Sequence, residues 1–328
     1  KLEGAKSVDV LSDILSTMKL QGTLYFRTDF SAPWGVQVPA FERVSRFHYV
    51  HHGRCHVRID SVKYPVSLDQ GDLIIVTRGA SHILSDPLNA PVETVDDVVS
   101  ASGFSGSGAL VHSTASSGHK TKLVCGHFTV DAEASHPLIE ALPAYIHIRN
   151  DEDVANAWLK STLDLIASEA GHDQLGGDLV TIRLSEIILA QAIRVFLENN
   201  QGREPVFAAF ADKRIRRALD AIHTSPSDPW TIEQLAMQAG MSRTAFNSRF
   251  HLTMGMTPLS YLTKWRMQVA RRLLLDSDKS MIDVAEASGY RSEASFGRTF
   301  KKHFNVAPAS FRRQSKPADH IGIPLDSR

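Results

Sequence analysis

The sequence predicts an α+β protein of two domains, and two patterns lead to this prediction. Residues 22–130 contain short runs rich in β-branched and aromatic residues, interrupted by Gly, Pro and Asp, as in a β-sandwich or a β-barrel. From about residue 135 onward, apolar residues recur at helical spacing. A chain of 328 residues is also longer than one compact core usually supports. We therefore expect a β-rich half followed by an all-α half.

The predicted domain boundaries follow these changes of pattern. The first domain covers residues 1–200, with a short helix within 8–20, the β-rich region 22–130 and helices within 135–200. Residues 201–211 are predicted to be a linker, since Gly202 and Pro205 end the preceding helix. The second domain covers 212–316, and 317–328 form a C-terminal tail. The Ser- and Gly-rich stretch 100–119 predicts a mobile surface loop.

The charge balance differs between the two halves, although the net charge is zero. Residues 212–316 contain 18 Lys and Arg against 9 Asp and Glu, whereas residues 1–211 contain 17 against 25. This asymmetry indicates that the second half binds a polyanion.

The cysteines and the hydropathy pattern bear on the cellular compartment. Two cysteines, Cys55 and Cys125, are too few for a disulfide framework and fit a reducing environment. No run reaches the roughly 18 to 20 apolar residues that a membrane helix needs, and no signal-peptide pattern is present. We therefore expect a cytoplasmic protein without a membrane partner.

Two segments, residues 231–258 and 280–308, repeat one scheme. Each has an alanine where two helices would cross, a glycine for a tight turn, a serine that caps the next helix, and two phenylalanines spaced i, i+4. In order, these residues are Ala236, Gly240, Ser242, Phe246 and Phe250 in the first segment, and Ala285, Gly289, Ser292, Phe296 and Phe300 in the second. The scheme predicts two helix-turn-helix units joined by a long helix.

The helix faces opposite the phenylalanines are the candidates for contacts with double-stranded DNA, since these faces would enter the major groove. In the first unit the candidates are Arg243, Thr244, Asn247 and Ser248, and in the second unit they are Ser292, Glu293 and Arg298. Candidates for phosphate contacts are Lys301, Lys302 and Arg312. The alternative for each is a solvated surface residue.

The stretch ARRLLLDSDKSMIDVAEASGYRSEASFGRTFKKHFNVAPASFRR, residues 270–313, resembles the signature of the AraC/XylS family of bacterial transcription regulators. The resemblance extends over about 212–314. It implies seven helices, of which the third and sixth, about 242–253 and 292–303, enter adjacent major grooves. It also implies a sequence-specific regulator that works with RNA polymerase, and it leaves open whether the output is activation or repression.

The segment GDLIIVTRGASHILSD, residues 71–86, resembles the second motif of the cupin family. Gly71, Gly79 and His82 match that motif, whereas Thr77 replaces a proline and Asp86 an asparagine. The resemblance implies that residues 1–200 form a cupin-like β-barrel that binds a small-molecule effector, with helices behind it that mediate homodimerisation. The strongly apolar segment 177–199 is interpreted either as a core helix or as a dimer interface.

Two sets of residues are candidates for binding within the cupin-like half. The candidates for the effector pocket are Arg27, Trp34, Arg43, His48 and His82. The candidates for a zinc-like ion are His48, His82, Cys125 and His127, with packing residues as the alternative and no cofactor required. A cupin metalloenzyme with a helical appendage is the rival hypothesis. The histidines at 48–56 do not have the spacing of the first cupin metal motif, and such an enzyme has no use for tandem helix-turn-helix units, so a non-enzymatic regulator is favoured.

Overall fold

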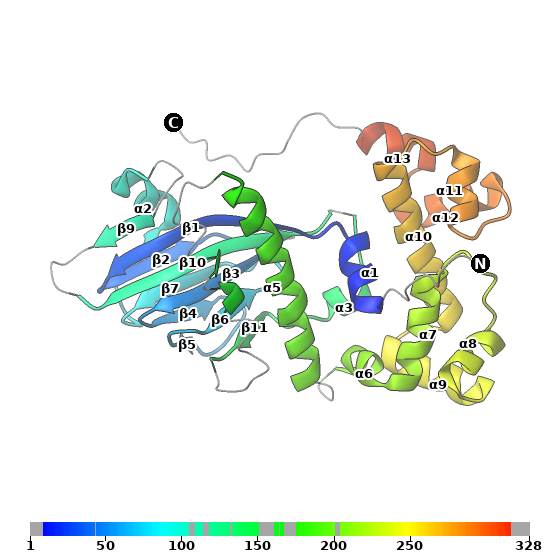
Figure 1. Cartoon of the computed structure of the whole chain (residues 1–328), viewed down its shortest axis with the longest axis horizontal. Coiled ribbons are helices and arrows are strands. Elements are labelled where there is room, and N and C mark those ends of the chain that lie inside the picture. The colour runs from blue at the N-terminus through cyan, green and yellow to red at the C-terminus, as the bar shows by residue number, and fades with distance from the viewer. Residues whose placement is uncertain are drawn as a thin grey trace. The chain divides into compact units, whose positions relative to one another are not determined.

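The computed structural model describes residues 9–42, 44–104, 109–113, 118–131, 133–150, 161–163, 165–166, 175–200 and 204–315. They fall into two compact units (Figure 1). The first, here called the β unit, consists of Lys19–Ala132 and Leu138–Gln201. The second, the helical unit, consists of Lys1–Met18, Glu133–Pro137 and Gly202–Arg328. This α+β layout confirms the predicted fold class.

The β unit contains two sheets. Their strand orders are β11-β6-β3-β10-β1-β9 and β5-β4-β7-β2-β8. The strands are β1 (Gln21–Ser31), β2 (Trp34–Val38), β3 (Val44–His52), β4 (Cys55–Ile59), β5 (Val66–Leu68), β6 (Leu73–Val76), β7 (His82–Asp86), β8 (Glu93–Thr94), β9 (Ala109–Ser113), β10 (Lys120–Thr129) and β11 (Tyr145–Ile148).

Side chains from both sheets share one core. Trp34 and Val57, from the smaller sheet, and Val50 and Ile74, from the larger one, are at most 1% exposed and belong to the same cluster. Burial alternates along β4, as expected for a strand with one face on the core. The family resemblance implied a barrel, but the described strands form two separate sheets around this core and do not close.

Part of the stretch that was predicted to be a mobile loop is regular structure. Helix α2 (Val95–Ser102) extends into it, and β9 runs parallel to β1. Leu110 on β9 is fully buried in the core that the two sheets share. The prediction was wrong for 109–113, because one buried leucine on a five-residue strand leaves little trace in a Ser- and Gly-rich composition.

The region 135–200 is less uniformly helical than predicted. Helix α3 (Pro137–Glu140) is followed by strand β11, which pairs antiparallel with β6. Helix α5 (Gly177–Asn199) then packs on β1, where Gly22 permits a close approach: a Cβ atom there would lie 2.8 Å from Cβ of Ser185. The helix predicted within 153–170 lies largely outside the described residues.

The helical unit contains α1 (Val10–Thr17), α6 (Pro205–Ala211), α7 (Lys213–Thr224), α8 (Ile232–Ala239), α9 (Arg243–Met254), α10 (Pro258–Asp276), α11 (Met281–Ala287), α12 (Glu293–Phe304) and α13 (Pro308–Ser315). Seven helices, α7 to α13, occupy the fully described stretch Lys213–Ser315, as the resemblance implied. Within the part of the chain that the structure describes, no helix combines the length and apolarity needed to cross a membrane.

Helix α6 lies where a linker was predicted. Pro205 occupies its first turn, where a missing N–H costs nothing, and Val206, Phe207 and Phe210 are buried. The glycine and proline signals at 202 and 205 marked the end of one helix correctly, but they also precede the start of another. Burial of these apolar side chains stabilises a helix that is too short to be predicted from periodicity.

Candidate nucleic-acid interface

The first helix-turn-helix unit consists of α8 and α9. Gly240 ends α8 with a left-handed φ of 63°, and the Ser242 side chain caps α9 by accepting a hydrogen bond from the Ala245 N–H at 3.3 Å. Phe246 and Phe250 are fully buried, with ring centroids 5.6 Å apart. The predicted third helix, 242–253, is thus confirmed with a shift of one residue.

The second unit, α11 and α12, repeats this construction. Gly289 has a φ of 79°, and Ser292 caps α12 by accepting from the Ser295 N–H at 3.3 Å. Phe296 and Phe300 are fully buried, again with ring centroids 5.6 Å apart. Burial of two phenylalanines fixes the rotation of each recognition helix about its axis, and so decides which side chains face outward.

Most of the predicted DNA-contacting side chains lie on the exposed faces of α9 and α12 or at their first residues. They are Arg243, Thr244 and Ser248 on α9, and Ser292, Glu293, Arg298, Lys301 and Lys302 at or on α12. On α12, Arg298 is followed at i+3 and i+4 by the two lysines, so three cations share one face. This face has the charge needed to contact phosphates.

Asn247 and Arg312 differ from the other candidates because both are partly buried. The Oδ1 atom of Asn247 and the Nε and Nη2 atoms of Arg312 are enclosed and have no hydrogen-bond partner among the described residues. These enclosed atoms can contact DNA only after a change of rotamer, and the proposed roles of the two residues stay predictions.

Two ion pairs involve arginines of α9. Nη1 of Arg243 lies 3.0 Å from Oε1 of Glu233, but the side chains are 67% and 54% exposed, so solvent screens the pair and Arg243 stays available. Arg249 binds Asp212, which also caps α7. Partial burial acts to raise the pKa of Asp212, but hydrogen bonds from the Arg214 N–H and Arg249 outweigh it, so this pKa lies below its ordinary value.

Arg266 on α10 connects the loop before the first helix-turn-helix unit with the turn of the second unit, a role that the sequence did not reveal. Its Nε donates to the carbonyl oxygen of Pro226 at 2.7 Å and its Nη2 to that of Asp228 at 2.8 Å. The guanidinium carbon also lies 6.0 Å from the ring centroid of Tyr290, in the turn of the second unit. A Cβ atom on Gly289 would come within 2.7 Å of this guanidinium. Arg266 thus links the loop before α8 to the turn between α11 and α12.

The predicted effector-pocket residues lie mostly inside the sandwich. Trp34 is 1% exposed and packs against Phe30 with ring centroids 4.9 Å apart. His48 and His82 are 4% and 0% exposed, whereas Arg27 is only partly buried. Arg43 lies outside the described residues.

Three of the proposed metal ligands form a chain of hydrogen bonds. Nε2 of His48 lies 2.8 Å from Nε2 of His82, and Nδ1 of His48 lies 3.2 Å from Sγ of Cys125. Nδ1 of His82 donates to the Ala80 carbonyl oxygen at 3.0 Å. Because that bond fixes the tautomer of His82, the Cys125 thiol donates to His48, and His48 donates to His82.

Burial favours the neutral forms of His48, His82 and Cys125, the three hydrogen-bonded side chains. It lowers the pKa of His48 well below its usual range and that of His82 to about 4, and it raises the pKa of the Cys125 thiol. His127, the fourth proposed ligand, also has its pKa lowered by burial, to about 4. Neutral imidazoles bind metals well, but a thiol must lose its proton first.

The arrangement of these residues does not fit a tetrahedral zinc site. Among the described residues, no group of three or more His, Cys, Asp and Glu side chains is placed to hold a metal ion. Nε2 of His48 faces His82, whereas Nδ1, the other ring nitrogen, faces Cys125. An ion bound at one of these nitrogens would lie next to His82 or next to Cys125, so one ion cannot bind all three side chains. His48, His82 and Cys125, which the sequence suggested as metal ligands, are hydrogen-bonded to one another in the structure.

A surface pocket of about 590 Å³ lies in the β unit, apart from the effector residues named above. It is lined by Tyr49, His51, His52, Gln70, Gly71, Lys120, Lys122 and Asn150. The Nζ atoms of Lys120 and Lys122 lie 3.7 and 3.6 Å from the carboxylate oxygens of Asp29. One carboxylate therefore neutralises only part of the charge of the two lysines.

The tandem helix-turn-helix units, each with an exposed polar face, define a DNA-binding protein of the transcription-regulator class. The family model described as "Cupin" matches residues 9–198, and the one described as "Helix-turn-helix domain" matches 235–314. An AraC-like transcription regulator of Streptomyces lividans is 30% identical over 310 residues, which cover 93% of this chain and 98% of that protein. The chain belongs to the AraC family of transcription regulators, with a cupin domain in its N-terminal half.

Another relative supports this assignment. The HTH-type transcriptional regulator AlkR of Acinetobacter baylyi is 29% identical over 312 residues, which cover 94% of this chain and 100% of that protein. Both relatives are named as regulators, which favours a regulator over an enzyme for this chain.

Proposed function

We propose that this protein binds double-stranded DNA in a sequence-specific manner through α9 and α12, and that a small-molecule effector bound in the β unit controls its output. The observation that carries the proposal is the paired construction of α9 and α12: each buries two phenylalanines and exposes a polar face. Such a regulator acts in the cytoplasm, where the chromosome is, and RNA polymerase is its partner at the promoter.

Arg298 and Lys301 are expected to contribute to DNA binding in different ways. Arg298→Ala removes a base contact, so it should weaken binding to the preferred sequence by about 1–3 kcal/mol and relax the preference at one base pair. Lys301→Ala removes a phosphate contact, so it should weaken binding to all sequences alike and reduce the salt slope by about 1. Fluorescence anisotropy with a duplex selected from random DNA, at several salt concentrations, measures both effects.

A matched control for these variants is Lys63→Ala, which removes an exposed lysine of the β unit and should leave DNA affinity unchanged. The proposal fails if selection from random DNA yields no preferred sequence. It also fails if Arg298→Ala, like Lys301→Ala, weakens binding to the selected duplex and to random duplexes by the same factor.

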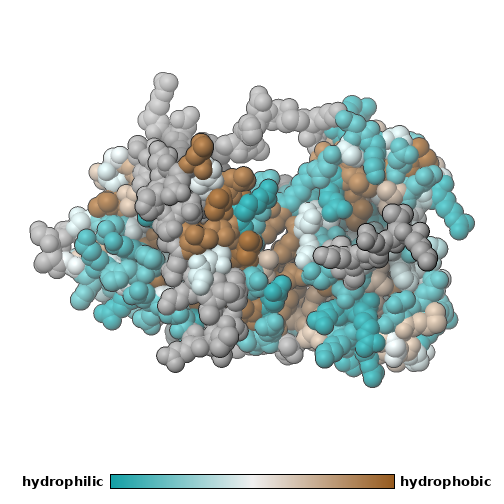
Figure 2. Space-filling model, in the orientation of Figure 1, coloured by the Kyte–Doolittle hydropathy of each residue, from teal (hydrophilic) through white to brown (hydrophobic). Residues whose placement is uncertain are grey.

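We further propose that the protein is a homodimer in which two copies of α5 pack together. One side of α5 exposes apolar side chains: Leu179 is 60% exposed, Val180 40% and Ile187 47%. Figure 2 shows hydrophobic side chains gathered over the first turns of this helix. The opposite side, with Ile188 and Ala192, is fully buried, so α5 serves both as a core helix and as an interface.

Ile187→Glu is expected to convert the dimer to a monomer, because an unpaired carboxylate buried between two helices costs several kcal/mol. Sedimentation velocity at micromolar concentration should show the dissociation constant rise by more than about a hundredfold. Leu252→Glu, which changes a 75% exposed leucine of the helical unit, is the matched control and should remain dimeric. A monomeric native protein, or a dimeric Ile187→Glu variant, would contradict the proposed interface.

The polar pocket beside Tyr49 offers the effector a second place to bind besides the interior candidates. Its lysines and histidines favour a ligand that carries acidic or hydrogen-bond-accepting groups. A screen of small carboxylates and phosphates by thermal unfolding, followed by DNA binding with each hit, tests this part of the proposal. A ligand that stabilises the protein without changing its DNA affinity or output would not be the effector.

A further inference from the structure

The helical unit includes two segments that come from the N-terminal half of the sequence. Helix α1 and residues 133–137 both belong to it. Along the chain, α1 ends just before β1, and residues 133–137 follow β10. Each segment is therefore covalently continuous with a strand of the β unit, although it packs among the helices that carry the first helix-turn-helix unit.

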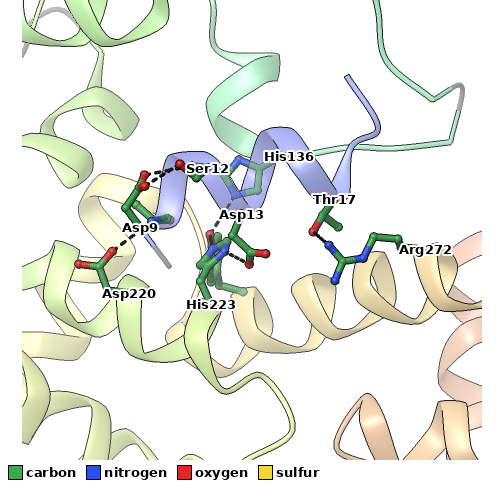
Figure 3. Close-up of polar contacts among 10 residues, drawn as sticks. Asp9, Ser12, Asp13, Thr17, His136, Asp220, His223 and Arg272 are labelled. Carbon is green, nitrogen blue, oxygen red and sulfur yellow. Dashed lines mark hydrogen bonds and ion pairs between the residues drawn. The ribbon is translucent and has the colours of Figure 1, made fainter. Parts of the chain in front are cut away.

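Helix α1 contacts α7 and α10 through both apolar and polar groups. Val10 and Ile14 are at most 3% exposed. The Val10 N–H donates to Oδ1 of Asp220 on α7 at 3.2 Å, and Nη1 of Arg272 on α10 donates to Oγ1 of Thr17 at 3.0 Å (Figure 3). These bonds hold both ends of α1.

Between these ends lies a buried cluster of four side chains, here called the histidine cluster: Asp13 on α1, His136 from the 133–137 segment, His223 on α7 and Tyr261 on α10. Oδ2 of Asp13 lies 2.9 Å from Nδ1 of His223. The Tyr261 hydroxyl lies 2.7 Å from Nε2 of His223 and 2.9 Å from Nε2 of His136. The two histidines are at most 4% exposed, and Tyr261 is 1% exposed.

The four groups form one directional chain of hydrogen bonds when both imidazoles are neutral. Asp13 accepts the Nδ1 proton of His223, whose Nε2 then accepts from the Tyr261 hydroxyl, and the Tyr261 oxygen accepts the Nε2 proton of His136. An extra proton on Nε2 of His223 would face the hydroxyl proton of Tyr261. That conflict is relieved only if Tyr261 and His136 reverse their donor and acceptor roles.

We propose that the histidine cluster is an acid-sensitive joint, which holds α1 and residues 133–137 on α7 and α10, the helices before and after the first helix-turn-helix unit, while His136 and His223 are neutral and releases them when these imidazoles are protonated. The joint lets the DNA-binding helices respond to pH through the two segments that lead into the sheets. It acts in addition to effector binding and does not depend on it.

The charged and titratable groups around the two imidazoles come from each element packed against them. Asp13 on α1 and Asp220 on α7 favour a positive His223, whereas His223 disfavours a positive charge on His136. Tyr261 on α10 stays neutral, because burial raises its pKa well above the ordinary value. The Trp265 ring, with its centroid 4.1 Å from that of His223, and the Phe210 ring beside His136 are apolar neighbours that exclude water.

The direction of the pH effect follows from these surroundings. Burial lowers the pKa of His136 well below 6.5, and it also lowers the pKa of His223, although Asp13 opposes the shift. The docked state therefore binds fewer protons than the undocked state at mildly acidic pH. Docking is fully stabilised above about pH 6.5 and weakens as the pH falls below it, by about tenfold per pH unit for each proton taken up.

Hydrogen–deuterium exchange of the full chain between pH 5 and 8, corrected for intrinsic exchange rates, tests the joint. We expect the protection of the α1 amides to fall below pH 6.5 by about tenfold to a hundredfold per pH unit, while the α12 amides keep their protection. Unchanged protection of α1 down to pH 5 would overturn the proposal. So would a parallel loss in α12, which would indicate general acid unfolding.

Two kinds of variant sharpen the test. His136→Gln and His223→Gln keep a neutral hydrogen-bonding side chain and remove one titrating group each, so each should reduce the slope and the double variant should abolish it. Thr17→Val is the matched control: it removes the acceptor of Arg272 without removing a titrating group, so protection should fall about fivefold at every pH with the slope unchanged. If the double variant does not fold, NMR titration of both histidines in the native protein decides, and midpoints at or above 6.5 would refute the joint.

Discussion

Replacing Phe300 with Ala is expected to lower the free energy of unfolding of the helical unit by about 3–5 kcal/mol. The Phe300 ring is fully buried, and its centroid lies 5.6 Å from that of Phe296, 4.6 Å from that of Phe304 and 5.5 Å from that of Phe311. A cavity among the three remaining rings, in a cluster that includes side chains of α10, α11 and α13, cannot collapse without moving a helix. DNA affinity should fall as well, because α12 loses the anchor that fixes its outward face.

Native-state hydrogen exchange of the α11–α13 amides measures this change in stability. Leu252→Ala, on the exposed side of α9, is the control and should change stability by less than about 0.5 kcal/mol. A loss below about 1 kcal/mol for Phe300→Ala would show that the second unit rearranges around the missing ring, and that the packing described here is not required for its fold.

Gly79→Ala is expected to destabilise the β unit by more than about 2 kcal/mol. Gly79 has a left-handed φ of 67°, which by itself costs an alanine about 1–2 kcal/mol. A Cβ atom at this position would also overlap the carbonyl oxygen of Phe41, and the Phe41 N–H donates to the Gly79 carbonyl oxygen at 2.9 Å. The backbone has to move and loses that hydrogen bond, which adds about 1–3 kcal/mol of strain. Thermal unfolding measures the loss.

Gly103→Ala provides a closely matched comparison. Gly103 has nearly the same φ, 66°, but no atom of the described structure lies within 4 Å of the Cβ position. Gly103→Ala should therefore lower the free energy of unfolding only by the cost of the left-handed backbone conformation, about 1–2 kcal/mol. Equal losses for the two variants would mean that the contact with Phe41 contributes nothing and that only the backbone conformation matters.

The candidate DNA interface was predictable from the sequence because its pattern is local. Ser242 and Ser292 cap helices, and the phenylalanine pairs lie four residues apart, so both signals are contained within one or two helical turns. The starts and inward faces of α9 and α12 follow from such short-range rules, and so does the position of Arg298 and Lys301 on the outside. Gly79 was likewise recognised from its motif, although the carbonyl group that requires it was not.

Where a residue depends on partners far along the chain, the sequence did not reveal its role. Arg266 binds carbonyl groups 40 and 38 residues away, and His223 binds an aspartate 210 residues away. The sequence by itself determined that the chain ends in two helix-turn-helix units of the AraC type. Only the tertiary structure decided that α1 and His136 pack against α7 and α10. Periodicity shows which face of a segment is apolar, but the chain segment that buries that face depends on long-range packing.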